Sequence, residues 1–147
     1  DNFVKLEKTD FWGNDIIQGP YSVEDCAKLA MDNNSAKGFA TNSAGTYCWI
    51  KNKLENYNPN RPGVNMYIKK SQMPLNVYKK YNGQDCAIGK NLMFTRPITL
   101  DNCKKLCNSK KDCTGISYQN NMCYLKNKPC TNPRWSSWTF YGKDEIK

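Results

Sequence analysis

The sequence predicts an α+β protein built from two copies of one small, disulfide-bonded module. The chain of 147 residues contains eight cysteines, and six of them lie between residues 86 and 130. Within that region a stretch with helical spacing is followed by two short β-type runs. The same order of features occurs earlier in the chain, which indicates an internal repeat. Because half of this chain can form only a thin core, the even cysteine count predicts stabilising disulfides.

The clearest helix is predicted to begin after Thr99, whose hydroxyl can cap the first turn. Apolar and cysteine side chains then recur on one face, at Leu100, Cys103, Leu106 and Cys107. Cys103 and Cys107 are one turn apart, so both thiols should face the same interior. The runs 114–118 and 122–125 are typical of strands, with a polar turn between them. The second copy is therefore predicted to be a helix tied by disulfides to a β-hairpin.

The first copy is found by placing Cys26 on Cys103. A helix cap, a helix face, a glycine and a cysteine–aromatic–aliphatic–lysine strand then match in order, which is improbable by chance. The matched pairs are Ser22 with Thr99, Val23 with Leu100, Leu29 with Leu106, Ala30 with Cys107, Gly38 with Gly115, and residues 48–51 with 123–126. The same comparison places Asp15 on Asp85, and residues 65–69 on 139–143.

The predicted boundary lies at residue 71, giving modules 1–71 and 72–147. In the first module we expect an opening strand and a loop, a helix from Ser22 to about Asn33, a hairpin and a closing strand at 64–69. In the second module, residues 75–81 are predicted to be the opening strand. An aromatic-rich final strand is predicted at residues 135–141, after prolines that interrupt the chain.

The composition points to the secretory pathway. A disulfide framework is typical of an oxidising compartment, and no stretch approaches the length of a membrane span. The start at Asp1 suggests a processed form, and Asn33 begins one N-glycosylation sequon. The net charge of +9 favours acidic partners such as anionic glycans, although lysines also keep small secreted proteins soluble. A secreted or surface-delivered protein is expected, without a nucleic-acid partner.

No catalytic residue, metal site or cofactor is predicted. The chain contains no histidine, which excludes Ser–His and Cys–His nucleophile systems. The sequence contains no C-x-x-C pair that would suggest a zinc site, and no glycine-rich loop that would suggest a phosphate site. Asp15 and Asp85 each follow a glycine turn. They could be considered a glycosidase-like pair, but turn chemistry explains them better because each belongs to a different module.

These motifs together resemble PAN/apple modules. They are the capped helix with cysteines one turn apart, a G-[IF]-x-[YT] strand, a C-[YW]-[LI]-K strand and a G-x-D turn. The resemblance covers almost the whole chain and is more specific in the second copy. It implies a small curved antiparallel sheet that cradles one helix. In layout, the chain is similar to the small two-apple lectins of apicomplexan parasites.

The resemblance also implies a disulfide pairing. In the second module it pairs Cys86 with Cys130, Cys103 with Cys123 and Cys107 with Cys113, and in the first module Cys26 with Cys48. Alanines, Ala30 and Ala36, stand where the first copy would have the equivalents of Cys107 and Cys113. Because both partners are lost together, the repeat supports that pair independently of the family.

Such modules bind proteins or carbohydrates, so the resemblance implies a secreted adhesion protein that binds glycans and is not an enzyme. The alternative is a protein-binding ligand or inhibitor without sugar binding, and a third interpretation is a coat component or homodimer that self-associates. Exposure and repetition suggest one set of ligand-binding residues: Lys104, Lys110, Lys111, Lys126, Lys128, Arg134 and Trp135.

Overall fold

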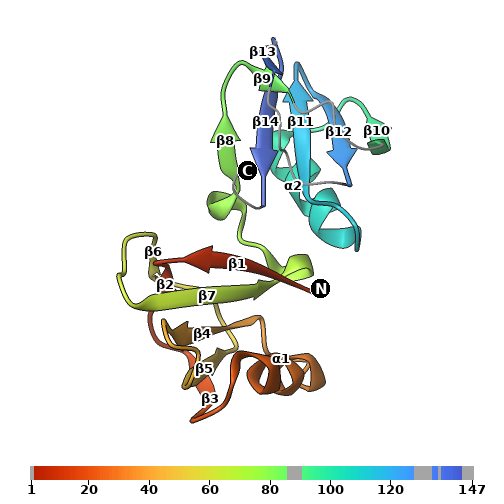
Figure 1. Ribbon diagram of the computed structural model, residues 1–147. Helices are drawn as coiled ribbons and strands as arrows, with labels where there is room; N and C mark the ends of the chain where they lie inside the picture. Colours follow the sequence, from red (N-terminus) through yellow and green to blue (C-terminus); the bar gives the residue numbers. More distant parts are fainter. Residues whose placement is uncertain (1, 86–90, 128–133, 136, 144–147) are drawn as a thin grey trace. The chain divides into compact units, whose positions relative to one another are not determined.

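The computed structural model describes residues 2–85, 91–127, 134–135 and 137–143 (Figure 1). The chain divides into two compact units, Asp1–Gln72 and Met73–Lys147. We call them unit 1 and unit 2 and describe each by itself. In both, antiparallel strands dominate and a single α-helix lies against one sheet, so the predicted α+β class is confirmed.

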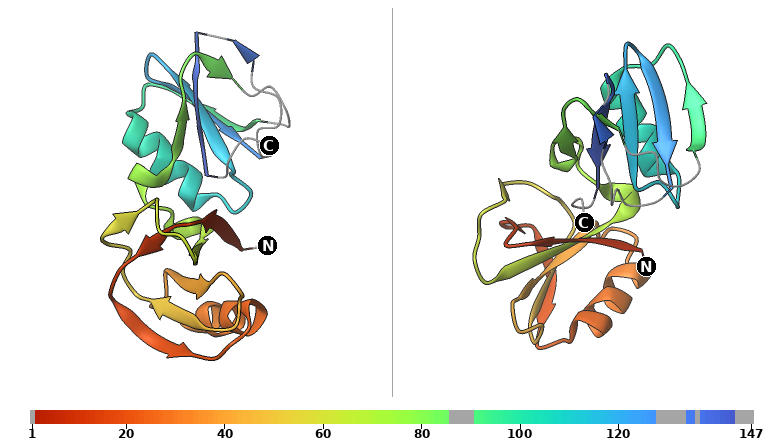
Figure 2. Two further views of the ribbon diagram at one scale, coloured as in Figure 1. Left: turned by 60° about the vertical axis from the view of Figure 1, so that its left-hand side comes forward. Right: turned by 45° about the horizontal axis from the view of Figure 1, so that its top comes forward.

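Unit 1 is a five-stranded antiparallel sheet with the order β1-β7-β4-β5-β3, and a two-stranded sheet of β2 and β6. Helix α1 packs on β4 and β5 (Figure 2). Its elements are β1 Phe3–Glu7, β2 Asp10–Phe11, β3 Asp15–Gly19, α1 Val23–Asp32, β4 Gly38–Asn42, β5 Cys48–Lys51, β6 Tyr57–Asn58, β7 Val64–Lys69 and the 3₁₀ turn η1 Lys70–Gln72.

Unit 2 repeats this topology strand for strand. Its main sheet has the order β8-β14-β11-β12-β10, and β9 pairs with β13 in a small second sheet. Helix α2 packs on β11 and β12. The elements are the 3₁₀ turn η2 Leu75–Val77, β8 Lys79–Tyr81, β9 Gln84–Asp85, β10 Asn91–Thr95, α2 Leu100–Ser109, β11 Gly115–Gln119, β12 Met122–Lys126, β13 Arg134–Trp135 and β14 Thr139–Gly142.

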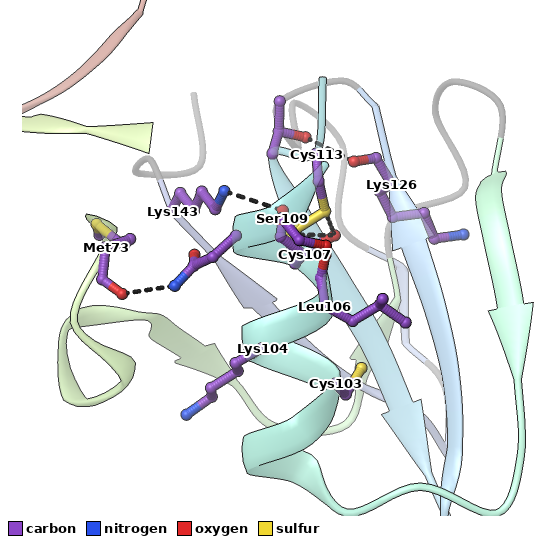
Figure 3. The surroundings of a disulfide bond; sticks show 12 residues. Met73, Cys103, Lys104, Leu106, Cys107, Ser109, Cys113, Lys126 and Lys143 are labelled. Carbon is purple, nitrogen blue, oxygen red and sulfur yellow. Dashed lines mark hydrogen bonds between the residues drawn. A yellow bond between two sulfur atoms is a disulfide. The ribbon is translucent and has the colours of Figure 1, made fainter. Parts of the chain in front are cut away.

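Both helices begin where the sequence predicted. The Asp25 N–H donates to Ser22 Oγ at 3.1 Å, and the Asn102 N–H donates to Thr99 Oγ1 at 3.2 Å. A lysine at the end of the last strand of unit 1, and one just after the last strand of unit 2, contact the C-terminal end of the helix. Lys69 Nζ donates to the Asn33 carbonyl, and Lys143 Nζ donates to the Cys107 carbonyl (Figure 3). Both lysines therefore complement the negative end of a helix dipole.

Disulfides join each helix to its hairpin. The structure contains the predicted pairs Cys26–Cys48, Cys103–Cys123 and Cys107–Cys113. All six cysteines are buried, and so are the alanines that replace the last pair in unit 1. The predicted pair Cys86–Cys130 lies outside the described residues.

The strand register corrects one part of the repeat alignment. Asp15 pairs with Lys51 at the start of β3, and Asn91 pairs with Lys126 at the start of β10. A register irregularity follows both pairs. Asn91, and not Asp85, is therefore the equivalent of Asp15. Asp85 instead belongs to the small β9–β13 sheet. The two G-x-D turns look alike, but only cross-strand pairing defines equivalence between sheets.

Three further differences concern short elements. The edge strands β3 and β10 were not predicted, and of the strand expected at 75–81 only Lys79–Tyr81 is extended. Leu75–Val77 forms a 3₁₀ turn after Pro74, which places the buried Tyr78 against α2. These segments lack the alternation of a strand with one buried face, so periodicity could not identify them.

The repeated glycine marks a close approach of two strands. A Cβ at Gly38 would lie 2.4 Å from the Tyr67 carbonyl oxygen, and one at Gly115 would lie 2.7 Å from that of Tyr141. Tyr67 and Tyr141 occupy equivalent positions in the last strand of each unit. The first strand of the hairpin therefore requires glycine where it meets that strand.

We predict that Gly115→Ala destabilises unit 2 by about 2 kcal/mol or more, because the new methyl group meets backbone that cannot move aside. Gly19→Ala is a matched control, since the atoms nearest to its Cβ belong to the Tyr21 side chain and not to backbone. Urea unfolding of both variants gives the comparison. Equal losses would contradict the close-approach explanation.

We also predict that the double variant Cys107→Ala/Cys113→Ala folds and loses about 2 kcal/mol, because its disulfide closes a short loop. Unit 1 already has alanines at these positions. Removing Cys103–Cys123, which closes a loop about three times as long, should cost about 3 kcal/mol. Hydrogen exchange of α2 amides in urea measures both losses, and a larger loss for the first variant would refute this order.

Candidate functional site

A concavity of about 300 Å³ opens on the sheet face of unit 1 that does not carry the helix. Strand alternation shows this: Phe39 and Ile50 belong to the core beneath α1, whereas their neighbours Ala40, Trp49 and Lys51 line the concavity. The full lining is Asp10, Trp12, Gly13, Asp15, Ala40, Trp49, Lys51, Arg61 and Val64.

An ion pair between a buried lysine and a more exposed aspartate forms part of the wall. The Lys51 side chain is 4% exposed, and its Nζ donates to Asp15 Oδ1 at 2.6 Å and to the Gly13 carbonyl at 3.1 Å. The pairing of β3 with β5 places Asp15 directly opposite Lys51. Burying an ammonium group is expensive unless it is paired and hydrogen-bonded, so these two contacts hold Lys51 in place.

Asp10 is the unusual residue of the wall. It lies on β2 and is 8% exposed, yet its Oδ1 atom is buried without a hydrogen-bond partner among the described residues. Buried polar atoms in native proteins are almost always paired, because an unpaired one costs free energy. The Asp10 carboxylate therefore has hydrogen-bonding capacity that no described residue satisfies, in a side chain that lines the concavity.

Two indole rings accompany these polar groups. Trp12 follows β2 and is 68% exposed, and its carbonyl accepts a hydrogen bond from the Asn56 side-chain amide at 3.0 Å. Trp49, on β5, packs against Tyr47 with ring centroids 4.8 Å apart. With Asp10, Asp15, Lys51 and Arg61, the lining has two acidic and two basic side chains. The concavity is therefore close to neutral, and it offers donors, acceptors and aromatic faces together.

Two residues of the predicted ligand set are buried, so the expectation that they are exposed was wrong. Lys104 donates from Nζ to the Leu75 carbonyl at 3.1 Å and lies over the rings of Tyr78 and Tyr141. Burial lowers the pKa of Lys104; Asp101 raises it and Lys80 lowers it further. Lys126 is 7% exposed, with its Nζ 5.6 Å from the Tyr124 ring centroid. Their aliphatic stems pack as apolar groups, which residue type alone does not reveal.

The other predicted residues are placed as follows. Lys110 and Lys111 are exposed just after α2. Arg134 and Trp135 form β13, and their side chains, like all of Lys128, lie outside what the structure describes. Asn33 is half-buried, and its Oδ1 accepts from the Ser35 N–H at 2.9 Å.

Sequence reasoning missed Asp10 and Arg61, and it interpreted Asp15 only as a turn residue. Repetition could not find Asp10, because the register of the small sheets makes Gln84 its equivalent in unit 2. One signal was available in the sequence: an acidic residue immediately before two aromatic residues, Phe11 and Trp12.

No family model matches the chain, and no curated protein matches it. Among solved structures it is similar to the two N-terminal apple domains (residues 58–231) of Toxoplasma gondii microneme protein 4. The similarity covers 94% of this chain and 85% of that one, with 14% identity and a TM-score of 0.38. In the described part of the chain, neither ten-residue helix is long and apolar enough to cross a membrane.

We predict that Tyr78→Phe reduces the loss of stability of unit 2 at alkaline pH. The Tyr78 hydroxyl donates to Asn108 Oδ1 at 2.6 Å, and burial raises its pKa well above 10. Above pH 10 the Tyr78 phenol ionises in the unfolded chain but stays neutral in the folded protein. The free energy of unfolding therefore falls by about 1.4 kcal/mol per pH unit on account of this residue.

The measurement is the melting temperature of both proteins between pH 8 and pH 11. At pH 8 the variant should be less stable by about 1 kcal/mol because it lacks the hydrogen bond. The lowered pKa of Lys104 makes stability rise with pH, which is the opposite dependence. Both proteins contain Lys104, so this effect does not change the comparison between them. Parallel pH profiles would contradict the prediction.

Proposed function

We propose that this chain is a secreted or surface-delivered binding protein whose unit 1 concavity binds a carbohydrate. The observation that carries the proposal is the buried, unpaired Oδ1 of Asp10 beside an exposed indole and a fixed lysine. Ligand sites combine apolar or aromatic surface with a few convergent polar groups. This concavity has that composition within the described residues of unit 1.

A sugar ring would use each of these groups. A hydroxyl donates to the Asp10 carboxylate, and another accepts from Lys51, which has one ammonium proton beyond the two that bind Asp15 and Gly13. The indole of Trp12 offers a flat surface for the C–H face of the ring. Because the lining charges balance, we propose a neutral sugar, whose binding should depend little on salt.

Secretion is the second part of the proposal. The buried disulfides of both units need an oxidising compartment to form. Glycosylation at Asn33 belongs to the same proposal, since its sequon follows α1 on the surface of unit 1.

An extracellular protein is the second candidate ligand. It is favoured by an apolar groove between β1 and α1, lined in part by Phe3, Ala27 and the exposed Met31. Exposed methionine is common at protein-binding surfaces because its side chain adapts to a partner. The carbohydrate is preferred because this groove has no unpaired buried polar atom.

The test is glycan-array screening followed by calorimetry. We predict that Asp10→Ala weakens binding of the best neutral sugar by about tenfold or more, because it removes a charged acceptor. The same variant should be at least as stable as the parent, since an unpaired buried oxygen is removed. Glu55→Ala removes an equal charge from an exposed position of unit 1 and should leave affinity unchanged.

Loss of binding with retained stability would support the site. Unchanged affinity in Asp10→Ala would exclude the concavity as the sugar site. If no neutral sugar binds the parent protein, the protein ligand becomes the preferred function, and substitution of Met31 tests that groove.

A further inference from the structure

Unit 2 carries a different surface at the position equivalent to the concavity of unit 1. On β12, Leu125 is buried beneath α2, so Tyr124 and Lys126 lie on the other face, as Trp49 and Lys51 do in unit 1. Phe94 lies opposite Tyr124 on β10, with ring centroids 4.4 Å apart. Phe94 is 43% exposed although large and apolar.

A cation stands next to this exposed ring. The Arg96 guanidinium lies 6.0 Å from the Phe94 ring centroid, and Arg96 also lines a second concavity of about 350 Å³. The rest of its lining is Pro97, Asn120, Asn121 and Met122. Asn120 and Asn121 have positive φ angles and form the two-residue turn between β11 and β12. The lining thus offers guanidinium and amide donors and contains no acid.

Arg96 is also not neutralised by neighbouring side chains. No carboxylate among the described residues lies within ion-pair distance of its guanidinium. The surrounding charge has the same sign. Unit 1 contains nine basic and eight acidic residues, whereas unit 2 contains thirteen and five, so nearly all of the net charge belongs to unit 2. A field of this sign concentrates anions near the site.

From these observations we propose that Arg96, Phe94 and the Asn120–Asn121 turn form a second site that binds the anionic group of an acidic sugar. The carboxylate or sulfate accepts from the guanidinium, which matches the geometry of both groups. The sugar ring lies on Phe94. This inference rests on the proposed glycan-binding function, but its site and its ligand differ from those of unit 1.

The dimensions favour a sugar over an acidic protein segment. A concavity of about 350 Å³ beside one exposed ring accommodates a single ring-shaped unit with its charged substituent. A stable protein partner would need a buried area of about 800 Å² on this surface. Trp138 contacts Tyr124, the aromatic neighbour of Phe94, edge-on with an interplanar angle of 62°. It therefore does not enlarge the flat aromatic surface that Phe94 offers.

The experiment measures binding of three probes to the full chain: a sialylated trisaccharide, a sulfated disaccharide and the uncharged parent sugar. We predict that Arg96→Gln weakens the anionic probes by about tenfold and reduces the salt dependence of their binding. Phe94→Ala should also weaken binding of the anionic probes. Arg96→Lys should restore only part of the affinity, because lysine lacks the planar fork. The two anionic probes show whether carboxylate or sulfate is preferred.

Lys111→Gln is the matched control, since it removes one positive charge from an exposed position of the same unit. Hydrogen exchange of α2 amides serves as the folding control for unit 2, and neutral-sugar binding through unit 1 should be unchanged in Arg96→Gln. Equal losses in Lys111→Gln and Arg96→Gln would overturn the proposal, because net charge alone would then explain binding. Loss of anionic binding only in Asp10→Ala would also overturn it, and would assign both ligands to unit 1. Equally tight, Arg96-dependent binding of an acidic peptide would overturn the choice of a sugar.

Discussion

The disulfide between the helix and the second strand of the hairpin is the constraint on which each unit depends. Cys26–Cys48 and Cys103–Cys123 close loops of similar length, and each is worth about 3 kcal/mol in a unit whose core is thin. The bond holds the helix on one face of the sheet. The opposite face is then left for the lining of a site; the concavity of unit 1 lies there, and so does the Phe94 ring of the unit 2 site.

On that opposite face the two units have diverged while their scaffolds have not. In unit 1, Lys51 is paired with Asp15, and Arg61 balances the second carboxylate, that of Asp10, so the concavity is close to neutral. In unit 2, Asn91 replaces that acid at the same register position, and the neighbouring surface combines Phe94 with Arg96. The same framework thus carries different side chains on this face in the two units. Most of the net charge of the chain lies in unit 2.

Sequence patterns predicted the elements whose stability is local or covalent. The helix caps Ser22 and Thr99 and the hairpins follow from short-range spacing, and the structure confirms them. The three described disulfide pairs were implied by the resemblance to PAN/apple modules, and the structure contains them. The edge strands β3 and β10 escaped prediction because their sequences lack the alternation of a strand with one buried face. The lysines misled for a related reason: whether a long basic side chain packs inward depends on which rings surround it, as at Lys104.

By itself, the sequence determined the fold class, the repeat and the absence of histidine chemistry, because these depend on composition and on the order and spacing of short motifs. Only the tertiary structure decided where a ligand could bind. Asp10, Trp12, Asp15 and Lys51 come from separate strands and loops, and they meet because β3 pairs with β5 across more than thirty residues of chain. Burial leaves one Asp10 oxygen unpaired, and burial is a property of the assembled sheet that local pattern does not contain.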